Sequence, residues 1–281
     1  MKRYVVPILG RAGLGNELFP ILRAVDVAHR EARSVIWPTW IQFKVGPFLR
    51  RERDKRMYWL LFRGPGLVGS LRRLRVRAMR NSLSANSPAQ KYATTQGMAG
   101  YFDGVKISGN DFRDILRAHA RKGAVSERLP HPYVAMHVRL GDFSRGESSV
   151  SVMNNNTSSP IEWFVTQANS VRQRHPKLRV YVCSDGSDDE LRSLLEVNGV
   201  RRSSARNALD DLFFLSHANG IVGSRSTFSA WGAFLGGVPL LVQPGGNAYR
   251  PHAQVWEVSP GGFPSAWHDE VENRQTRNGS L

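Results

Sequence analysis

The chain has 281 residues, 41% of them hydrophobic, so it can build a packed core in one large domain or in two of ordinary size, and wholesale disorder is excluded. Its single cysteine, Cys183, excludes an internal disulfide. No stretch approaches the roughly 18 apolar residues of a membrane span, and the apolar run after Met1-Lys2-Arg3 is too short for a signal peptide. We therefore expect a soluble, cytoplasmic protein.

The net charge of +16 is unevenly distributed. Between Arg50 and Arg80, eleven Lys or Arg residues stand against two Asp or Glu, a net of +9, with aromatic and aliphatic residues interleaved. Such a segment can lie on an anionic membrane surface, bind nucleic acid, or form a solvated helix face that attracts an anionic substrate. No nucleic-acid-binding motif accompanies the charge. We therefore rank an anionic acceptor, or peripheral contact with the inner face of a membrane, above nucleic acid.

The N-terminal elements follow the order strand, glycine-rich turn, helix. We predict a strand over residues Tyr4 to Leu9 and a turn over residues 10–16. A helix should follow, because apolar residues recur at helix spacing from Leu18 to Ala28. This order suits contact with a phosphate or a sugar at the helix N-terminus. A short strand over residues 34–37 follows, the pattern is weak between residues 39 and 108, and helical spacing returns between residues 112 and 119.

Strands and helices alternate clearly after a linker at residues 121–132. The pattern predicts strands over residues 133–139, 178–184, 220–222 and 238–242, and helices over residues 160–175, 188–198, 208–217 and 227–235. Such alternation predicts a parallel sheet. We expect an N-terminal domain over residues 1–125 with a basic insert at 49–80, a C-terminal domain over 130–265, and a flexible tail over 266–281.

The end of the strand Tyr133–Arg139 carries the strongest local signal. Side chains alternate along a strand, so His137 and Arg139 point the same way at its carboxyl end, where α/β sheets bind ligands. A guanidinium can grip a phosphate with two parallel hydrogen bonds. Gly141 permits a turn, and Asp142 can brace the arginine or the loop. The alternative is a strand followed by a turn with a surface salt bridge.

Four segments in order resemble the α-1,2-fucosyltransferases, the family 11 glycosyltransferases, within the wider group of GDP-fucose-dependent enzymes. They are Gly13-Leu14-Gly15-Asn16-Glu17, His137-Val138-Arg139-Leu140-Gly141-Asp142, Cys183-Ser184-Asp185, and the closing block that runs from Asp211 to Ser216 and from Ser226 to Ala233. Two residues depart from the family pattern: Glu17 stands where glutamine is usual, and Ala230 where a second tryptophan is common.

The resemblance implies an α/β, GT-B-like fold: two Rossmann-like halves with parallel sheets facing a cleft, the nucleotide held by the second half. It implies an inverting, metal-independent enzyme that moves L-fucose from GDP-fucose to a hydroxyl of a glycan or glycolipid, with no metal or other cofactor. Asp188-Asp189-Glu190 is better explained as helix capping than as a metal site. Two alternatives stay open: another nucleotide-sugar donor on the same fold, and a basic protein that binds nucleic acid or membrane.

The resemblance also assigns roles to the donor site. Arg139 would stabilise the charge that grows on departing GDP. Ser226 and Thr227 would receive a phosphate or cap a helix. Asp211 would bind guanine or favour the helix dipole, and the neighbouring Asp210 is the competitor for the guanine contact.

The remaining expected contacts are distributed between the halves. His137 would touch the base or ribose or lie in the core, and Asp185 would hold ribose or brace the arginine. Gly13, Gly15 and Asn16 would face the fucose or the β-phosphate.

A carboxylate near the acceptor hydroxyl could take its proton. Asp142 and Glu17 are the two candidates for this general base, and the departing phosphate is the alternative to both.

Overall fold

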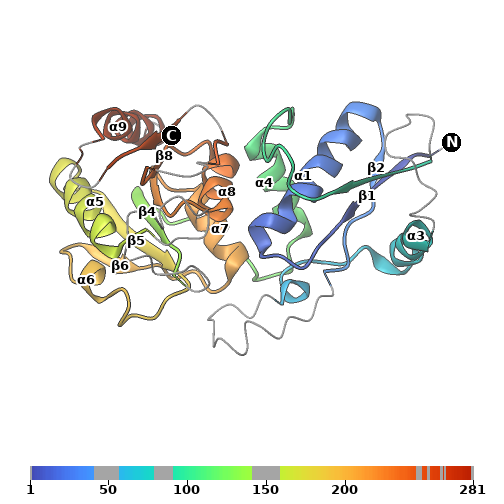
Figure 1. Cartoon of the computed structure of the whole chain (residues 1–281), viewed down its shortest axis with the longest axis horizontal. Helices are drawn as coiled ribbons and strands as arrows, with labels where there is room; N and C mark the ends of the chain where they lie inside the picture. The colour runs from blue at the N-terminus through green and yellow to red at the C-terminus, as the bar shows by residue number, and fades with distance from the viewer. Residues whose placement is uncertain are drawn as a thin grey trace. The chain divides into compact units, whose positions relative to one another are not determined.

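The computed structural model of the chain describes residues 2–40, 57–78, 91–140, 159–244, 249–251, 254–259, 262 and 264–279. These residues form two compact units, which we call unit 1 (described residues up to Val125) and unit 2 (those from Ser126 onward). Figure 1 shows the elements of each unit. Within the described residues, no helix combines the length and the apolar character that crossing a bilayer requires.

Unit 1 is built on a three-stranded parallel sheet in the order β2-β1-β3, formed by Tyr4–Ile8 (β1), Ser34–Val35 (β2) and Tyr92–Gln96 (β3). Helix α1 (Leu14–Glu31) packs against β1 and β3, and its buried face is the apolar stripe that the sequence predicted. The other face of the sheet holds a cluster that includes Val76 of helix α3 (Gly66–Ala78). The 3-10 turn η1 (Tyr58–Leu60) and helix α4 (Gly109–His119) complete the unit.

Unit 2 is built on a six-stranded parallel sheet in the order β6-β5-β4-β7-β8-β9. Its strands are Tyr133–Val138 (β4), Arg179–Ser184 (β5), Val200–Arg202 (β6), Gly220–Gly223 (β7), Leu240–Val242 (β8) and Val255–Glu257 (β9). If the strands are counted from β4, this order is 3-2-1-4-5-6, which is the order of the Rossmann fold. The sequence-based expectation of an α/β fold with parallel sheets is confirmed.

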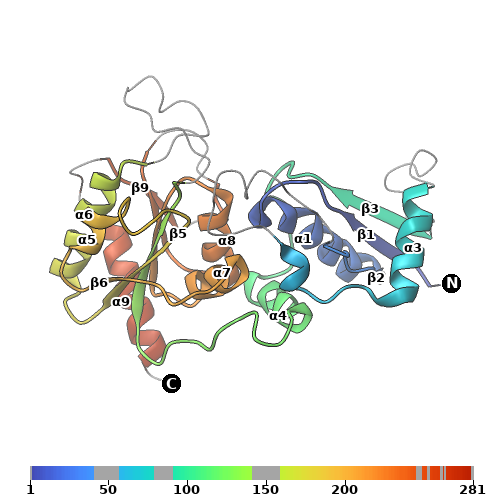
Figure 2. The same cartoon turned by 90° about the horizontal axis from the view of Figure 1, so that it is seen from below.

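Helices cover both faces of the unit 2 sheet (Figure 2). Val134 and Met136 of β4 pack on the side of α5 (Ile161–Arg174), α6 (Arg192–Leu195) and α9 (Ser265–Gly279). Tyr133 and Ala135 pack on the side of α7 (Ala208–Ser216) and α8 (Thr227–Gly236). By strand alternation, His137 belongs to the α7 and α8 side.

Two expectations about helices are corrected by the structure. The predicted flexible tail forms helix α9, which buries Trp267 and Val271 completely in the core of unit 2. The helix predicted over residues 188–198 is limited to α6, and residues 188–191 form turns before it.

Candidate active site

The carboxyl ends of β4 and β7 mark the place where the strand order of unit 2 reverses. Strands β5 and β6 lie on one side of β4, whereas β7, β8 and β9 follow on the other. Open α/β sheets bind ligands in the crevice beyond the strand ends at such a switch point. Arg139 follows β4 there, and the Arg139 N–H donates to Oγ of Ser224, which follows β7, at 2.9 Å. This bond ties the two strand ends together.

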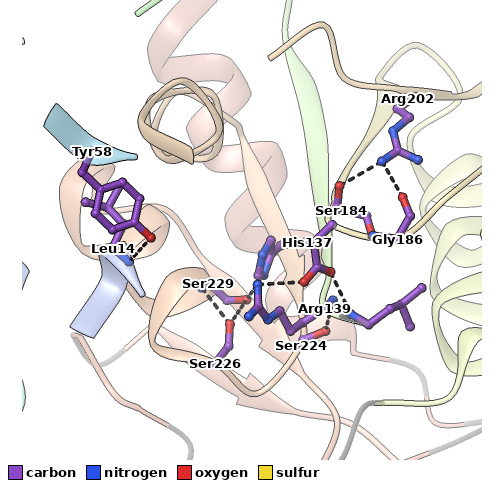
Figure 3. Close-up of polar contacts among 12 residues, drawn as sticks. Leu14, Tyr58, His137, Arg139, Ser184, Gly186, Arg202, Ser224, Ser226 and Ser229 are labelled. Atoms are coloured by element: carbon purple, nitrogen blue, oxygen red, sulfur yellow. Dashed lines mark hydrogen bonds and ion pairs between the residues drawn. The ribbon is translucent and has the colours of Figure 1, made fainter. Parts of the chain in front are cut away.

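Arg139 forms an ion pair with Asp185 at the end of the neighbouring strand β5. Nη1 of the arginine lies 2.8 Å from Oδ2 of the aspartate, and Oδ1 of the same carboxylate accepts the Leu140 N–H at 2.9 Å. The arginine side chain is 25% exposed and that of the aspartate 12%, so the guanidinium is held in place while part of it still faces solvent. Figure 3 shows Arg139 beside Ser224 and His137. The geometry shows that Asp185 braces the arginine, which was one of its two expected roles.

His137 is buried and neutral. Its Nδ1 lies 2.7 Å from Oγ of Ser229, and its ring stacks on Phe228 at a centroid distance of 5.0 Å. Burial and, to a smaller extent, the positive charge of Arg139 together lower the pKa of His137 to about 3. At neutral pH the imidazole is therefore a hydrogen-bonding and stacking group rather than a cation or an acid.

Ser226 caps helix α8 next to this histidine. Its Oγ accepts the Ser229 N–H at 3.2 Å and lies 3.2 Å from Oγ of Ser229 (Figure 3). Thr227 is the first residue of α8 and is half-buried. Ser226 therefore has the expected capping role. Its hydroxyl also contacts the hydroxyl of Ser229, which in turn contacts His137. The two roles that the sequence left open, capping and phosphate contact, are compatible.

A pocket in unit 2 gathers several of the expected donor residues. Its lining comes from the ends of β4 and β5, the start of α7 and the start of α8, and consists of His137, Arg139, Ser184, Asp185, Ala205, Arg206, Asn207, Ala208, Asp211 and Phe228. Four of these residues were expected to bind the donor: His137, Arg139, Asp185 and Asp211. The pocket thus combines cationic and anionic side chains with one aromatic ring.

Sequence reasoning did not select Arg206, Asn207 and Phe228 for this site. Asn207 is the N-cap of α7, with its side chain accepting the N–H groups of Leu209 and Asp210. An asparagine directly before an apolar helical run is a recognisable cap signal. It marks the start of α7 in the sequence but does not reveal that Arg206 lies at the strand ends.

The structure distinguishes the two neighbouring carboxylates of α7. Asp210 is buried at 2% exposure and accepts the Ser126 N–H at 2.7 Å, the Ser126 hydroxyl at 2.8 Å and the Arg206 N–H at 3.0 Å, so it fixes the local chain. Asp211 faces the pocket and the thiol of Cys183. Burial raises the pKa of Cys183, and Asp211 raises it further, so the thiol stays protonated. Of these two neighbouring carboxylates, Asp211 is the one that lines the pocket.

The expected residues of the first segment lie in unit 1. Glu17 is 2% exposed, and its carboxylate accepts the Gly10 N–H at 2.8 Å and the Ala12 N–H at 2.7 Å. This geometry gives Glu17 a structural role in the glycine-rich turn. Its expected role as general base stays a prediction.

The N-terminus of α1 also has partners of its own. Gly13 is the N-cap residue, and the Leu14 N–H donates to the hydroxyl of Tyr58 at 2.7 Å (Figure 3). Gly15 is buried and Asn16 half-buried. Tyr58 belongs to the basic insert, which the motifs alone did not connect with this turn.

Asp142, the other expected general base, lies outside the described residues. The acidic run after β5 is engaged by arginines: Asp188 lies 2.6 Å from Arg202, and Asp189 lies 2.6 Å from Arg192. Among the described residues, no group of three or more His, Cys, Asp and Glu side chains is arranged to hold a metal ion.

The described residues form two α/β units with parallel sheets, and unit 2 has the Rossmann strand order with a pocket of charged side chains at its strand ends. The model of glycosyl transferase family 11 matches residues 107–240. This match confirms the resemblance drawn from the motifs, and the chain is a glycosyltransferase. The motif at residues 13–17 lies outside the matched region.

Comparison with solved structures finds proteins of low sequence identity. A fucosyltransferase NodZ from Bradyrhizobium is 15% identical, with 87% of this chain and 95% of that chain covered and a TM-score of 0.47. The ADP-heptose LPS heptosyltransferase II of E. coli is 14% identical over 99% of this chain and 100% of that one, with a TM-score of 0.48. A mutant of Arabidopsis thaliana FUT1 in complex with GDP is 14% identical, with 91% of this chain and 72% of that chain covered and a TM-score of 0.46. No curated protein matches the chain.

Proposed function

We propose that this glycosyltransferase moves L-fucose from GDP-fucose to a hydroxyl of a glycan or glycolipid, forming an α-1,2 linkage with inversion at the anomeric carbon. The family 11 match supports the fucosyl assignment. The observation that carries the proposal is the braced Arg139 at the switch point of a Rossmann sheet, with Asp211 lining the same pocket.

Arg139 would stabilise the leaving diphosphate. Negative charge grows on GDP as its bond to fucose breaks, and a cation already fixed in position stabilises that charge without having to reorganise. The ion pair with Asp185 and the bond from the Arg139 N–H to Ser224 supply this fixed position. Because a guanidinium performs the role that a divalent ion has in other transferases, we propose that the reaction needs no metal.

Asp211 would select guanine. A carboxylate can accept the ring N–H and the exocyclic amino group of guanine together, whereas adenine lacks that pair of donors on one edge. Asp211 lies in the first turn of α7 and lines the pocket. It also contacts the Cys183 thiol, so its carboxylate is already oriented. The neutral His137 and the ring of Phe228 would add a flat surface for the base or the ribose.

In the transfer step, an acceptor oxygen forms a bond to the anomeric carbon on the side opposite to GDP, the bond between that carbon and the phosphate oxygen breaks, and the electron pair leaves with GDP. The acceptor proton passes to a carboxylate or to the departing phosphate. We propose Asp142 rather than Glu17 for the carboxylate, since Glu17 is engaged with two backbone N–H groups.

Isothermal titration calorimetry tests the donor assignment. We expect GDP and GDP-fucose to bind at least about tenfold more tightly than UDP and ADP, a difference of about 1.4 kcal/mol. Arg139→Ala should remove most of this binding. The matched control is Arg192→Ala, which removes an exposed arginine that does not line the pocket. Equal affinities for GDP and UDP would refute the choice of guanine.

Product analysis tests the sugar and the metal independence. Incubation with a panel of nucleotide sugars and free glycans, followed by mass spectrometry, should show a deoxyhexose added from GDP-fucose. Turnover should survive EDTA. Transfer of another sugar would support the alternative donor, and activity that disappears with EDTA and returns with manganese would contradict the role given to Arg139.

A further inference from the structure

Helix α3 presents an apolar face to solvent. Leu67 is 78% exposed, Val68 60%, Leu71 59% and Leu74 64%. Leu67, Leu71 and Leu74 are spaced by four and three residues, so they share one face of the helix. Single exposed leucines are ordinary, but a row along one helix is an interaction surface. We call Leu67, Val68, Leu71 and Leu74 the α3 face.

The opposite side of α3 is fastened to the sheet of unit 1. Arg73 donates from Nη1 to the Ile36 carbonyl at 3.2 Å and from Nη2 to the Pro7 carbonyl at 3.0 Å. Val76 is 1% exposed in the core cluster. A Cβ atom added to Gly69 would lie 2.6 Å from Cβ of Pro65, which shows how closely the chain packs there. The helix is therefore held by one side, with its leucines directed outward.

Helix α3 and the sequence around it are rich in arginine. Arg72 lies over the ring of Tyr4 with its guanidinium carbon 4.7 Å from the centroid. The sequence of the helix also contains Arg75 and Arg77. The sequence between residues 50 and 80 has a net charge of +9. An apolar row on an arginine-rich helix is the pattern of a helix that lies in the surface of an anionic bilayer.

We propose that α3 docks the protein on an anionic phospholipid membrane, with the α3 face inserted among the acyl chains and the neighbouring arginines on lipid phosphates. A second copy of the chain fits less well, because a symmetric contact would place the two arginine-rich helices together. Nucleic acid also fits less well, because the exposed face carries leucine and valine rather than aromatic rings on which bases stack. This proposal is independent of the donor sugar.

Vesicle flotation with the full chain tests the proposal. The protein should float with vesicles of phosphatidylcholine and phosphatidylglycerol, and about tenfold less with phosphatidylcholine alone. Raising the salt concentration should weaken the binding. The triple variant Leu67→Ser, Leu71→Ser, Leu74→Ser should lose binding by about tenfold or more and keep its circular dichroism spectrum, since all three side chains are exposed.

Two double variants that remove the same charge test whether vesicle binding depends on the arginines of α3 or only on the net charge of the protein. Arg75→Gln with Arg77→Gln should weaken vesicle binding by about tenfold. Arg192→Gln with Arg277→Gln removes the same charge from exposed sites in unit 2 and should leave binding unchanged. Equal loss in both pairs would show that only net charge matters and would overturn the proposal.

The two alternative partners of the α3 segment, a second copy of the chain and nucleic acid, predict different results. Sedimentation equilibrium that shows a dimer, dissociated by the leucine variant, without vesicle binding would assign the face to a second copy. Binding to RNA that the leucine variant retains, again without vesicle binding, would assign the charge to nucleic acid. Either result would overturn membrane docking. Failure of GDP binding, in contrast, would affect only the proposed reaction.

Discussion

Arg139 and Asp185 join the ends of two adjacent parallel strands through an ion pair of 2.8 Å between Nη1 and Oδ2. The other carboxylate oxygen holds the backbone of Leu140 at 2.9 Å. One aspartate therefore fixes both the side chain and the following residue of the candidate phosphate-binding arginine. This arrangement makes Asp185 a positioning residue whose effect on the reaction passes through Arg139.

We expect Asp185→Asn to weaken GDP binding about tenfold, about 1.4 kcal/mol, because the amide preserves the shape but removes the charge that orients the guanidinium. Calorimetry with GDP measures the loss. Asp188→Asn is the control, since Asp188 is paired with Arg202 and does not line the pocket. A double variant with Arg139→Ala should show no additional loss, whereas additive losses would contradict a positioning role.

Glu17 gives a second prediction. Glu17→Ala should lower the free energy of unfolding by about 1 to 2 kcal/mol, because two partly buried backbone N–H groups lose a charged acceptor. Urea denaturation measures it, with Glu196→Gln at an exposed position as the control.

The pH profile of kcat distinguishes the structural role of Glu17 from a catalytic one. If Glu17 is structural, Glu17→Gln should retain a profile of unchanged shape. Loss of a titrating limb with unchanged stability would show instead that Glu17 is the general base.

The alternating strands and helices of unit 2 could be predicted because each is an apolar run bounded by polar turns. Strands β3, β6 and β9 were missed: β6 and β9 have three residues each, and Tyr92–Gln96 is mostly polar. Their strand conformation depends on pairing with β1, β5 and β8, and such long-range pairing leaves no local periodicity. Helix α9 was missed for a related reason, since few of its residues are apolar and it is stabilised by the burial of Trp267 and Val271.

The site could be predicted only where motifs coincide with strand ends. Arg139 and Asp185 follow predicted strands, and parallel strands bring their ends together. Arg206 precedes α7 in the chain and lines the pocket only because of the way the chain folds, which local sequence does not reveal.

Helix α9 is joined to α5 by a hydrogen-bonded pair of histidines. Nε2 of His175 lies 2.9 Å from Nδ1 of His268, and Nε2 of His268 lies 3.0 Å from Oγ of Ser170. Burial lowers the pKa of His268 to about 4 and also lowers the pKa of His175; Arg174 acts in the same direction, and Asp269 and Glu272 oppose it.

Both histidines are therefore favoured in their neutral form when folded. In the unfolded chain they take up protons near their ordinary pKa of about 6.5, so the stability they contribute is complete above that pH and is lost as the pH falls toward about 4. We expect the urea concentration at the unfolding midpoint to decrease as the pH is lowered from about 7 to about 5. His268→Gln should flatten this dependence, whereas His29→Gln, at an exposed position, should not. A wild-type midpoint that does not change with pH would refute the assignment.

The close packing of α7 and α8 gives the last prediction. A Cβ atom added to Gly236 would lie 1.9 Å from the Ser216 carbonyl oxygen, so the two helices meet at a point where only glycine fits. Because the obstructing atom belongs to the backbone, Gly236→Ala must separate the helices, and we expect a loss of about 3 kcal/mol in the free energy of unfolding. Gly64→Ala is the matched control, since an added Cβ there meets nothing within 4 Å. The shift of α8 would also move Ser226, so GDP binding should weaken even at temperatures where the variant is folded. A variant as stable as the control, with unchanged GDP affinity, would show that the helices do not pack as closely as the structure describes.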